Sequence, residues 1–167
     1  MIQLDAEAIY RSLLAHARER YAGRDIRLVG IHTGGVWLAE RLRSDLKVEA
    51  PIGQLDPSFY RDDFDTTGLH ANVRPSSIGF EVAGAHIVLV DDVLYTGRTI
   101  RAAMNELFDH GRPAAIDLAV LVDRGGRELP VAASLVGSTI EVPAGVSVVL
   151  ARGDDGRLSL TLESGDA

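Results

Sequence analysis

The chain has 167 residues, of which 46% are hydrophobic and 25% charged, a composition that excludes wholesale disorder. It contains no cysteine, which excludes disulfides and thiolate metal sites, and no apolar run of about 18 residues that could cross a membrane. The formal net charge of -7 disfavours non-specific binding to nucleic acid. We therefore expect one soluble, cytoplasmic domain over residues 1–167, with no membrane segment.

The first part of the chain alternates between helical and extended patterns. A helix is predicted over residues 5–21, because apolar side chains recur along one helical stripe, and a strand is predicted over 26–31. The tight loop 32–35 leads into a second predicted helix over 36–46, and a further strand is predicted over 51–60. This alternation is typical of an α/β domain whose sheet is mostly parallel.

The rest of the chain continues the alternation after a polar interruption. Residues 61–75 have no sustained period, which is typical of a functional or a disordered loop. The apolar run 86–90 predicts a buried strand, and the clearest helical period of the chain covers 98–110. Another buried strand is predicted over 115–122, and short strands are predicted in the tail, 131–163.

The most informative segment is the one in which the strand 86–90 runs directly into Asp91 and Asp92. Ligands of open α/β sheets bind beyond the carboxyl ends of the strands, so both carboxylates are expected to project into that crevice. The small residues of the loop 95–99 then open a helix, whose amino end favours a phosphate group. Carboxylates repel phosphate, so they must face hydroxyl groups or a magnesium ion. The segment therefore predicts a site for a sugar phosphate with a free diol.

A structural alternative is that Thr99 merely caps the helix and that the two aspartates are solvated at a strand end. The rival phosphate-binding loops are absent, since the sequence contains neither G-x-x-x-x-G-K-[ST] nor G-x-G-x-x-G.

Residues 88–99 (VLVDDVLYTGRT) resemble the signature with which type I phosphoribosyltransferases bind 5-phosphoribosyl-1-pyrophosphate (PRPP). Their sequence is most similar to that of the pyrimidine operon regulator/uracil phosphoribosyltransferase family (PyrR). Residues 58–63 (SFYRDD) and 111–130 also resemble this family. The resemblance implies a central five-stranded parallel sheet flanked by helices. It also implies a flexible loop and a small β-rich hood, formed by roughly 128–145 with the N-terminal segment.

The resemblance also assigns roles to individual residues. Asp91 and Asp92 would be catalytic residues that hold the ribose hydroxyls, with Mg²⁺ held mostly by PRPP and only indirectly by these two carboxylates. Arg61 would be a further catalytic residue on the loop that closes over PRPP. The implied contacts are to pyrophosphate, the 5-phosphate and the base, and the substrate-binding residues are His32, Thr33, Gly34, Gly35, Tyr60, Tyr95, Thr96, Gly97, Arg98, Thr99, Asp123, Arg124, Arg127 and Val136.

The implied activity is transfer of the phosphoribosyl group from PRPP to uracil, giving UMP and pyrophosphate, by a homodimer or larger homo-oligomer. Purine-specific relatives carry an aspartate where this chain has Tyr95, which favours a pyrimidine base. The alternative is a non-catalytic sensor of UMP or PRPP that regulates pyrimidine synthesis through RNA or a protein partner.

Three departures from the family pattern bear on these roles. Well-known members carry an arginine where this chain has Gly34, and the loss of that cation predicts weaker transfer. Members that bind messenger RNA carry a histidine in place of Gly126 and basic residues in place of Ala132 and Ser138, so RNA binding is doubtful. Leu135 stands where relatives often place an aromatic ring.

Overall fold

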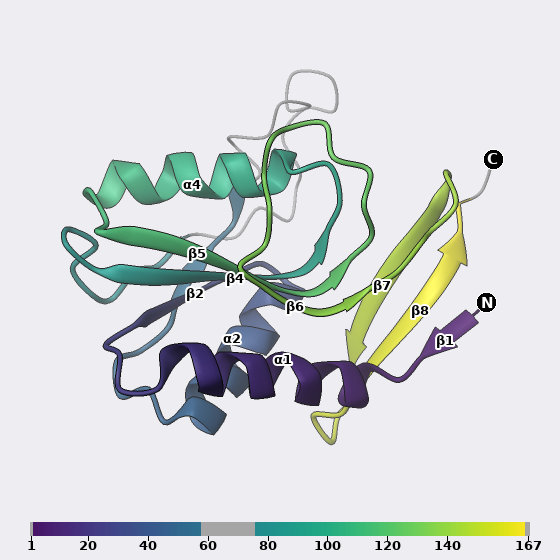
Figure 1. Ribbon diagram of the computed structural model, residues 1–167, viewed down its shortest axis with the longest axis horizontal. Coiled ribbons are helices and arrows are strands. Elements are labelled where there is room, and N and C mark those ends of the chain that lie inside the picture. Colours follow the sequence, from purple (N-terminus) through teal and green to yellow (C-terminus); the bar gives the residue numbers. More distant parts are fainter. Residues whose placement is uncertain (1, 58–75, 166–167) are drawn as a thin grey trace.

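The computed structural model describes residues 2–57 and 76–165 (Figure 1). The predicted strand 51–60 appears within these residues as a shorter strand, and Tyr60 and Arg61 lie outside them. The described helices and strands, in chain order, are β1 (Ile2–Leu4), α1 (Ala6–Tyr21), β2 (Arg27–Ile31), α2 (Gly34–Leu46), β3 (Gly53–Leu55), β4 (His86–Leu94), α4 (Arg98–His110), β5 (Ala115–Asp123), β6 (Leu135–Thr139), β7 (Val146–Arg152) and β8 (Leu158–Ser164).

The main sheet has five strands in the order β3-β2-β4-β5-β6. Every neighbouring pair is parallel, so all the carboxyl ends lie at one edge of the sheet. From β2 the chain passes to β3 on one side and then crosses to β4 on the other side of β2. This switch point lies between β2 and β4 and places the start of α2 beside the carboxyl end of β4. The α/β fold with a parallel sheet, predicted from the alternating pattern, is confirmed.

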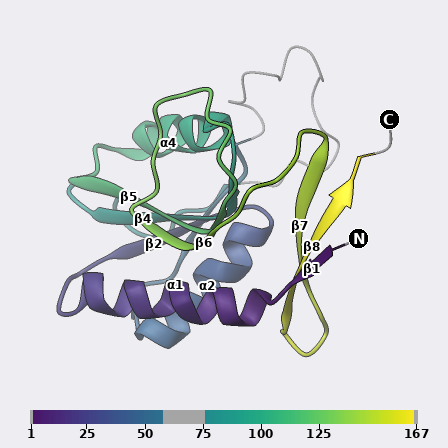
Figure 2. The same cartoon turned by 45° about the vertical axis from the view of Figure 1, so that its right-hand side comes forward.

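Helices cover both faces of this sheet. Figures 1 and 2 show α1 and α2 on one face and α4 on the other. The central strand alternates between the two layers: Val88 and Val90 pack in the cluster with α1 and α2, whereas Ile87 and Leu89 pack with α4. This alternation follows from the two-residue period of a strand, and burial on both faces explains the continuous apolar run.

The central strand is longer than the sequence pattern predicts. It was expected to end at Val90, but β4 continues to Leu94 because its last residues still pair with β5, as Asp91 does with Val120 and Leu94 with Asp123. Asp91 and Asp92 therefore lie within a hydrogen-bonded strand, which fixes their backbone more firmly than a loop would.

The small β-rich part differs from the expected range of 128–145. It is an antiparallel sheet in the order β1-β8-β7, which includes the N-terminal segment, as expected, but takes its other strands from 146–152 and 158–164. Residues 135–139 instead form β6, because they find a free edge of the main sheet beside β5. Figure 2 shows the small sheet beside the edge of the main sheet at which the strands end. No helix in the described residues is long and apolar enough to cross a membrane.

Candidate functional site

The acid pair lies near the carboxyl end of β4, within its last four residues. Asp91 is only 6% exposed, and its Oδ1 atom accepts a hydrogen bond from the N–H of Asp92 at 2.8 Å. Asp92 Oδ1 in turn accepts one from the N–H of Val93 at 2.8 Å. Burial, together with the adjacent charge of Asp92, raises the pKa of Asp91 well above its ordinary value. Such a carboxyl group gains stability from a hydroxyl donor or a cation, which is what a ribose diol and a metal ion supply.

The amino end of α4 begins three residues after the strand. Its N-cap is Gly97, in the left-handed region at φ 94°, and Thr96 Oγ1 accepts a hydrogen bond from the Arg98 N–H at 3.2 Å. The alternative in which Thr99 caps the helix is therefore wrong, since Thr99 lies inside the first turn. Gly97 has no side chain that could cap the helix, and Thr96 holds the Arg98 N–H, so the rest of the first turn is where an anion is favoured.

The segment 32–35 lies directly against the acid pair; its last two residues are the first two of α2, which begins at Gly34 and not at the predicted residue 36. The N–H of His32 donates to the Leu55 carbonyl at 2.9 Å, and the following peptide bond, to Thr33, is cis. A Cβ atom built on Gly35 would overlap the carbonyl oxygen of Val90 on β4. The predicted pyrophosphate loop and the predicted ribose-binding acids are thus neighbours in space.

The connection between β5 and β6 packs against the loop 95–97, which precedes α4 and is the predicted phosphate loop. The N–H groups of Glu128 and Leu129 both donate to the Thr96 carbonyl, at 2.9 and 3.1 Å. Arg127 donates from Nη1 to the Tyr95 carbonyl at 2.9 Å and from Nη2 to Asp123 Oδ2 at 2.6 Å. The hydrogen bond from Arg127 holds the pKa of Asp123 below its ordinary range. The predicted residues of the two segments therefore form one hydrogen-bonded unit.

A pocket of about 400 Å³ lies between this unit and the small sheet. On one side the Arg124 guanidinium stacks 3.9 Å from the centroid of the Tyr95 ring and donates to the Val146 carbonyl at 2.7 Å. The pocket is completed by Val93 and by residues 145–148 of the small sheet. Residues 145–148 could not be predicted as part of the site, because their partners are more than twenty residues away and no motif covers them.

Val136 is less closely connected to the rest of the site. It lies opposite Val120 on β5, which in turn lies opposite Asp91, so Val136 is level with the acid pair but two strands away. It packs against the cluster on the α4 side of the sheet.

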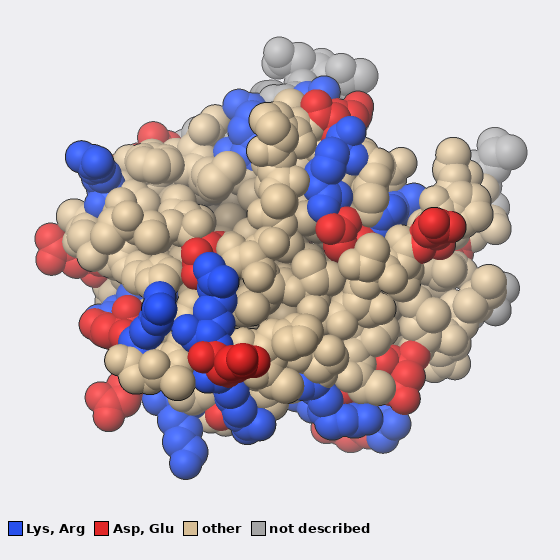
Figure 3. All heavy atoms as spheres, viewed as in Figure 1, with Lys and Arg blue, Asp and Glu red and all other residues tan. Residues whose placement is uncertain are grey.

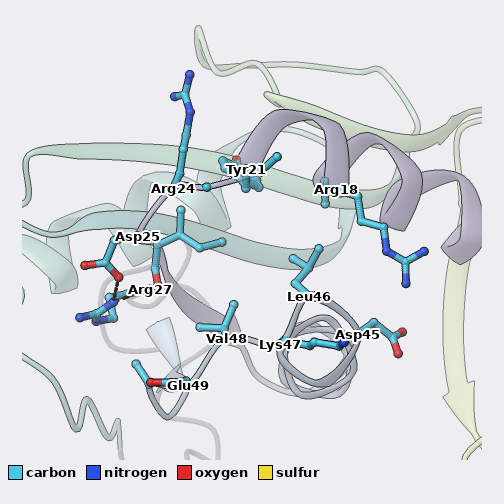
Figure 4. A pocket seen from close by; sticks show the side chains of 15 residues that line it. Arg18, Tyr21, Arg24, Asp25, Arg27, Asp45, Leu46, Lys47, Val48 and Glu49 are labelled. Carbon is cyan, nitrogen blue, oxygen red and sulfur yellow. Dashed lines mark hydrogen bonds and ion pairs between the residues drawn. The ribbon is translucent and has the colours of Figure 1, made fainter.

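A larger hollow than this pocket lies elsewhere in the described chain. It measures about 930 Å³ and is lined by the ends of α1 and α2 and by the start of β2 (Figure 4). That position is at the amino edge of the sheet, away from the acid pair. Its charges are mixed, since an Asp25–Arg27 ion pair and Glu49 lie beside Lys47. Figure 3 likewise shows acidic and basic side chains interspersed over the face it displays. This hollow is therefore separate from the acid pair and from the amino end of α4.

A parallel sheet whose central strand carries an acid pair near its carboxyl end, beside the amino end of a helix, is the arrangement of a phosphoribosyltransferase. The phosphoribosyl transferase domain family matches residues 3–150. A bifunctional protein PyrR from Nitrosococcus oceani is 47% identical over 164 residues, covering 95% of this chain and 93% of the relative. One from Pseudomonas aeruginosa is 57% identical over 130 residues, covering 78% and 76%.

Among solved structures, a hypoxanthine-guanine phosphoribosyltransferase from Bacillus anthracis has the same fold, with a TM-score of 0.67 at 21% identity over 84% of each chain. The chain belongs to the phosphoribosyl transferase domain family and, within it, to the bifunctional PyrR proteins.

Proposed function

We propose that the protein transfers the phosphoribosyl group of PRPP to uracil in a magnesium-dependent reaction, giving UMP and pyrophosphate. The observation that supports it is the meeting of three features at the carboxyl edge of the sheet. They are the acid pair on β4, the amino end of α4, and the segment 32–35 at the start of α2, which packs against β4. Each matches one part of PRPP: the ribose diol, the 5-phosphate and the pyrophosphate.

The residues act mainly by positioning. Asp91 and Asp92 accept hydrogen bonds from the ribose hydroxyls, and the N–H groups at the start of α4 donate to the 5-phosphate. The bond between ribose C1 and the pyrophosphate oxygen breaks as uracil N1 bonds to C1, and the N1 proton is released to solvent. The backbone that follows His32 in the segment 32–35 offers N–H groups to the departing pyrophosphate; the His32 N–H itself is bonded to the Leu55 carbonyl.

The acid pair fits a magnesium ion that the substrate helps to hold. Carboxylate oxygens are ligands that Mg²⁺ prefers, and the ion usually keeps ligands from substrate phosphates. In the described part of the chain no group of three or more His, Asp or Glu side chains could hold a metal ion by itself. When bound, Mg²⁺ neutralises part of the charge that develops on pyrophosphate.

The pocket between Tyr95 and the small sheet is the proposed site of the base. It opens beside Val93 at the end of β4, so a base there lies next to the ribose that the acid pair holds. Tyr95 is 41% exposed, and its ring is stacked on one side by Arg124. The relatives at 47% and 57% identity are PyrR proteins, which supports uracil as the base.

The acid pair provides the direct test. Asp91→Asn and Asp92→Asn keep the shape of each side chain but remove its charge, and each is expected to lower UMP formation on the order of a hundredfold. The assay follows labelled uracil with PRPP and Mg²⁺. Asp154→Asn is a matched control, because Asp154 lies exposed in the turn between β7 and β8. Undiminished turnover in both Asp91→Asn and Asp92→Asn would contradict the proposed site.

The relatives' name, bifunctional, favours a second function for the same pocket. We infer that it also senses UMP or PRPP, so that occupancy reports the supply of pyrimidine nucleotides to an RNA or protein partner. Calorimetry that finds UMP binding without any turnover of uracil would favour a sensor alone. The net charge of -7 does not favour RNA as that partner.

A further inference from the structure

Gly34 lies at the start of α2 in direct contact with the acid pair. A Cβ atom built on Gly34 would lie 2.5 Å from Oδ2 of Asp92, 3.0 Å from its Cγ and 3.1 Å from its Cβ. Non-bonded heavy atoms attract at about 3.5–4.0 Å and repel steeply at closer range. Any side chain at residue 34 therefore requires the Asp92 carboxylate to move.

Gly35 differs from Gly34 in what it faces. A Cβ on Gly35 would overlap the Val90 carbonyl oxygen and lie 3.1 Å from the Cα of Asp91. Those are backbone atoms of β4, which cannot turn away, whereas a carboxylate can rotate about its side-chain bonds. A side chain at 35 is therefore expected to disturb the packing of α2 on β4, and a side chain at 34 to displace one carboxylate while the backbone stays in place.

We propose that Gly34 is a positioning residue for the transfer reaction, because it leaves open the space in which the Asp92 carboxylate meets the ribose hydroxyls of PRPP. One oxygen of that carboxylate, Oδ1, is held by the Val93 N–H at 2.8 Å, and the other, Oδ2, faces Gly34. The carboxylate is thus located by contacts on both sides. This inference rests on the proposed function, since it concerns the same substrate at the same site.

The contact between Gly34 and Asp92 gives this glycine a steric role, which differs from the simple loss of an arginine charge at the same position. If the charge of an arginine at residue 34 were what mattered, restoring it would strengthen pyrophosphate binding. An arginine, however, introduces the same Cβ atom as an alanine. It therefore also displaces the Asp92 carboxylate, and this displacement opposes any gain from the guanidinium. Alanine and arginine at residue 34 are therefore both expected to impair PRPP binding in this chain.

The experiment compares Gly34→Ala and Gly34→Arg with the parent protein in a steady-state assay with uracil, PRPP and Mg²⁺. Both variants are expected to raise the KM for PRPP on the order of tenfold or more, since small displacements of a positioned group are costly. The KM for uracil and the melting temperature are expected to stay near those of the parent. Gly79→Ala is the matched control, because its added Cβ would make an ordinary contact, 3.6 Å from Cγ of Pro51. Gly35→Ala, by contrast, is expected to lower the melting temperature.

A double-mutant cycle shows whether the effect passes through Asp92. PRPP affinity is measured by calorimetry for Gly34→Ala in the parent and in an Asp92→Ala background, which lacks the two atoms nearest to residue 34. Gly34→Ala is expected to weaken binding in the parent and to cost little further in that background. Equal losses in the two backgrounds, or a lower KM for PRPP in Gly34→Arg than in the parent, would overturn the inference alone. A parent protein that neither binds PRPP nor forms UMP overturns the proposed function and the inference with it.

Discussion

Arg127 joins the β5–β6 connection to the residues before α4 through hydrogen bonds to four acceptors, the weakest of which is the Gly125 carbonyl at 3.5 Å. Its Nε donates to the Val131 carbonyl at 2.8 Å, and its two terminal nitrogens donate to the Tyr95 carbonyl and to Asp123. The sequence indicated Arg127 only by resemblance, as a residue near the base and pyrophosphate. In the structure the guanidinium holds the β5–β6 connection against residues 95–97. A planar fork of five N–H groups suits this task, and a lysine ammonium does not span it.

Arg127→Ala is expected to destabilise the fold by about 2 kcal/mol, because it removes the hydrogen bonds to the Val131 and Tyr95 carbonyls and to Oδ2 of Asp123. Arg127→Lys keeps the charge and is expected to recover only part of the loss. Urea unfolding measures both free energies. A lysine variant as stable as the parent would show that charge, and not the geometry of the fork, is what the connection needs.

At the scale of helices and strands, local patterns predicted most of the main sheet. The strand before Asp91 and the helix 98–110 are marked by a continuous apolar run and by a clear helical period, and both were placed correctly. The continuation of β4 to Leu94 could not be predicted, because it depends on pairing with β5 and not on local composition. The position of the small sheet was missed for the same reason: β1 and β8 are far apart in sequence.

Site residues that lie close together in the sequence could be predicted, whereas contacts between residues that are far apart in the sequence could not. Asp91 and Thr96 belong to one continuous segment, so a motif identifies them. The stacking of Arg124 on Tyr95 and its hydrogen bond to Val146 join three separate elements, and no spacing in the sequence reveals them. The close contact of Gly34 with Asp92 is of the same kind, because a glycine in the sequence does not say what it lies against.

The chain segments on either side of residues 58–75 are bound to each other and to α4. Gln54 and Ser77 exchange backbone hydrogen bonds of 2.7 and 2.8 Å. The Ser76 hydroxyl accepts a hydrogen bond from the Asp56 N–H at 3.3 Å and donates one to Oε1 of Glu106 on α4. Glu106 is only 8% exposed, and its Oε2 atom has no hydrogen-bond partner in the described residues. Burial raises the pKa of Glu106 above its ordinary value.

A raised pKa in the folded state means that protonated Glu106 is favoured by folding, so its contribution to stability is present at low pH and is lost as pH rises through the raised pKa. Glu106→Gln stays neutral and is expected to be more stable than the parent by about 1 kcal/mol near pH 8, with a smaller difference near pH 5. Ser76→Ala removes the donor and is expected to destabilise the fold most at the higher pH. Urea unfolding across this range measures both. A difference between Glu106→Gln and the parent that does not change with pH would contradict the assignment.

At the scale of the whole molecule, the carboxyl edge of the sheet forms the candidate site and the amino edge contributes to stability. The carboxyl edge carries the acid pair and the open helix amino end, which leave polar groups for a ligand. The amino edge is held by a satisfied polar cluster in which three donors converge on Oδ2 of Asp117: Tyr21 Oη at 2.7 Å, His86 Nε2 at 3.0 Å and Arg20 Nε at 3.3 Å. These contacts fasten the end of α1 to β4 and β5. We therefore expect stability and activity to respond separately to changes at the two edges.

Burial acts to raise the pKa of Asp117, but the hydrogen bonds from Tyr21, His86 and Arg20 outweigh it and hold the pKa below the ordinary value. A carboxylate with a lowered folded-state pKa stabilises the protein above its unfolded-state pKa, and this contribution is lost as pH falls through the folded-state value. Asp117→Asn is therefore expected to cost about 1–3 kcal/mol of unfolding free energy at neutral pH and progressively less in acid.

Urea unfolding of Asp117→Asn and the parent from neutral pH down to about pH 3 measures this dependence. Asp25→Asn is the matched control at the same edge, because the Asp25 side chain is 84% exposed and its ion pair with Arg27 is expected to contribute little. The KM for PRPP should stay unchanged in both variants, since the amino edge does not touch the acid pair. If Asp117→Asn unfolds like the parent at neutral pH, the cluster does not stabilise this edge. A raised KM for PRPP in that variant would show instead that the two edges are coupled through β4. The first residue of this strand, His86, contacts Asp117, and its seventh, Asp92, faces Gly34.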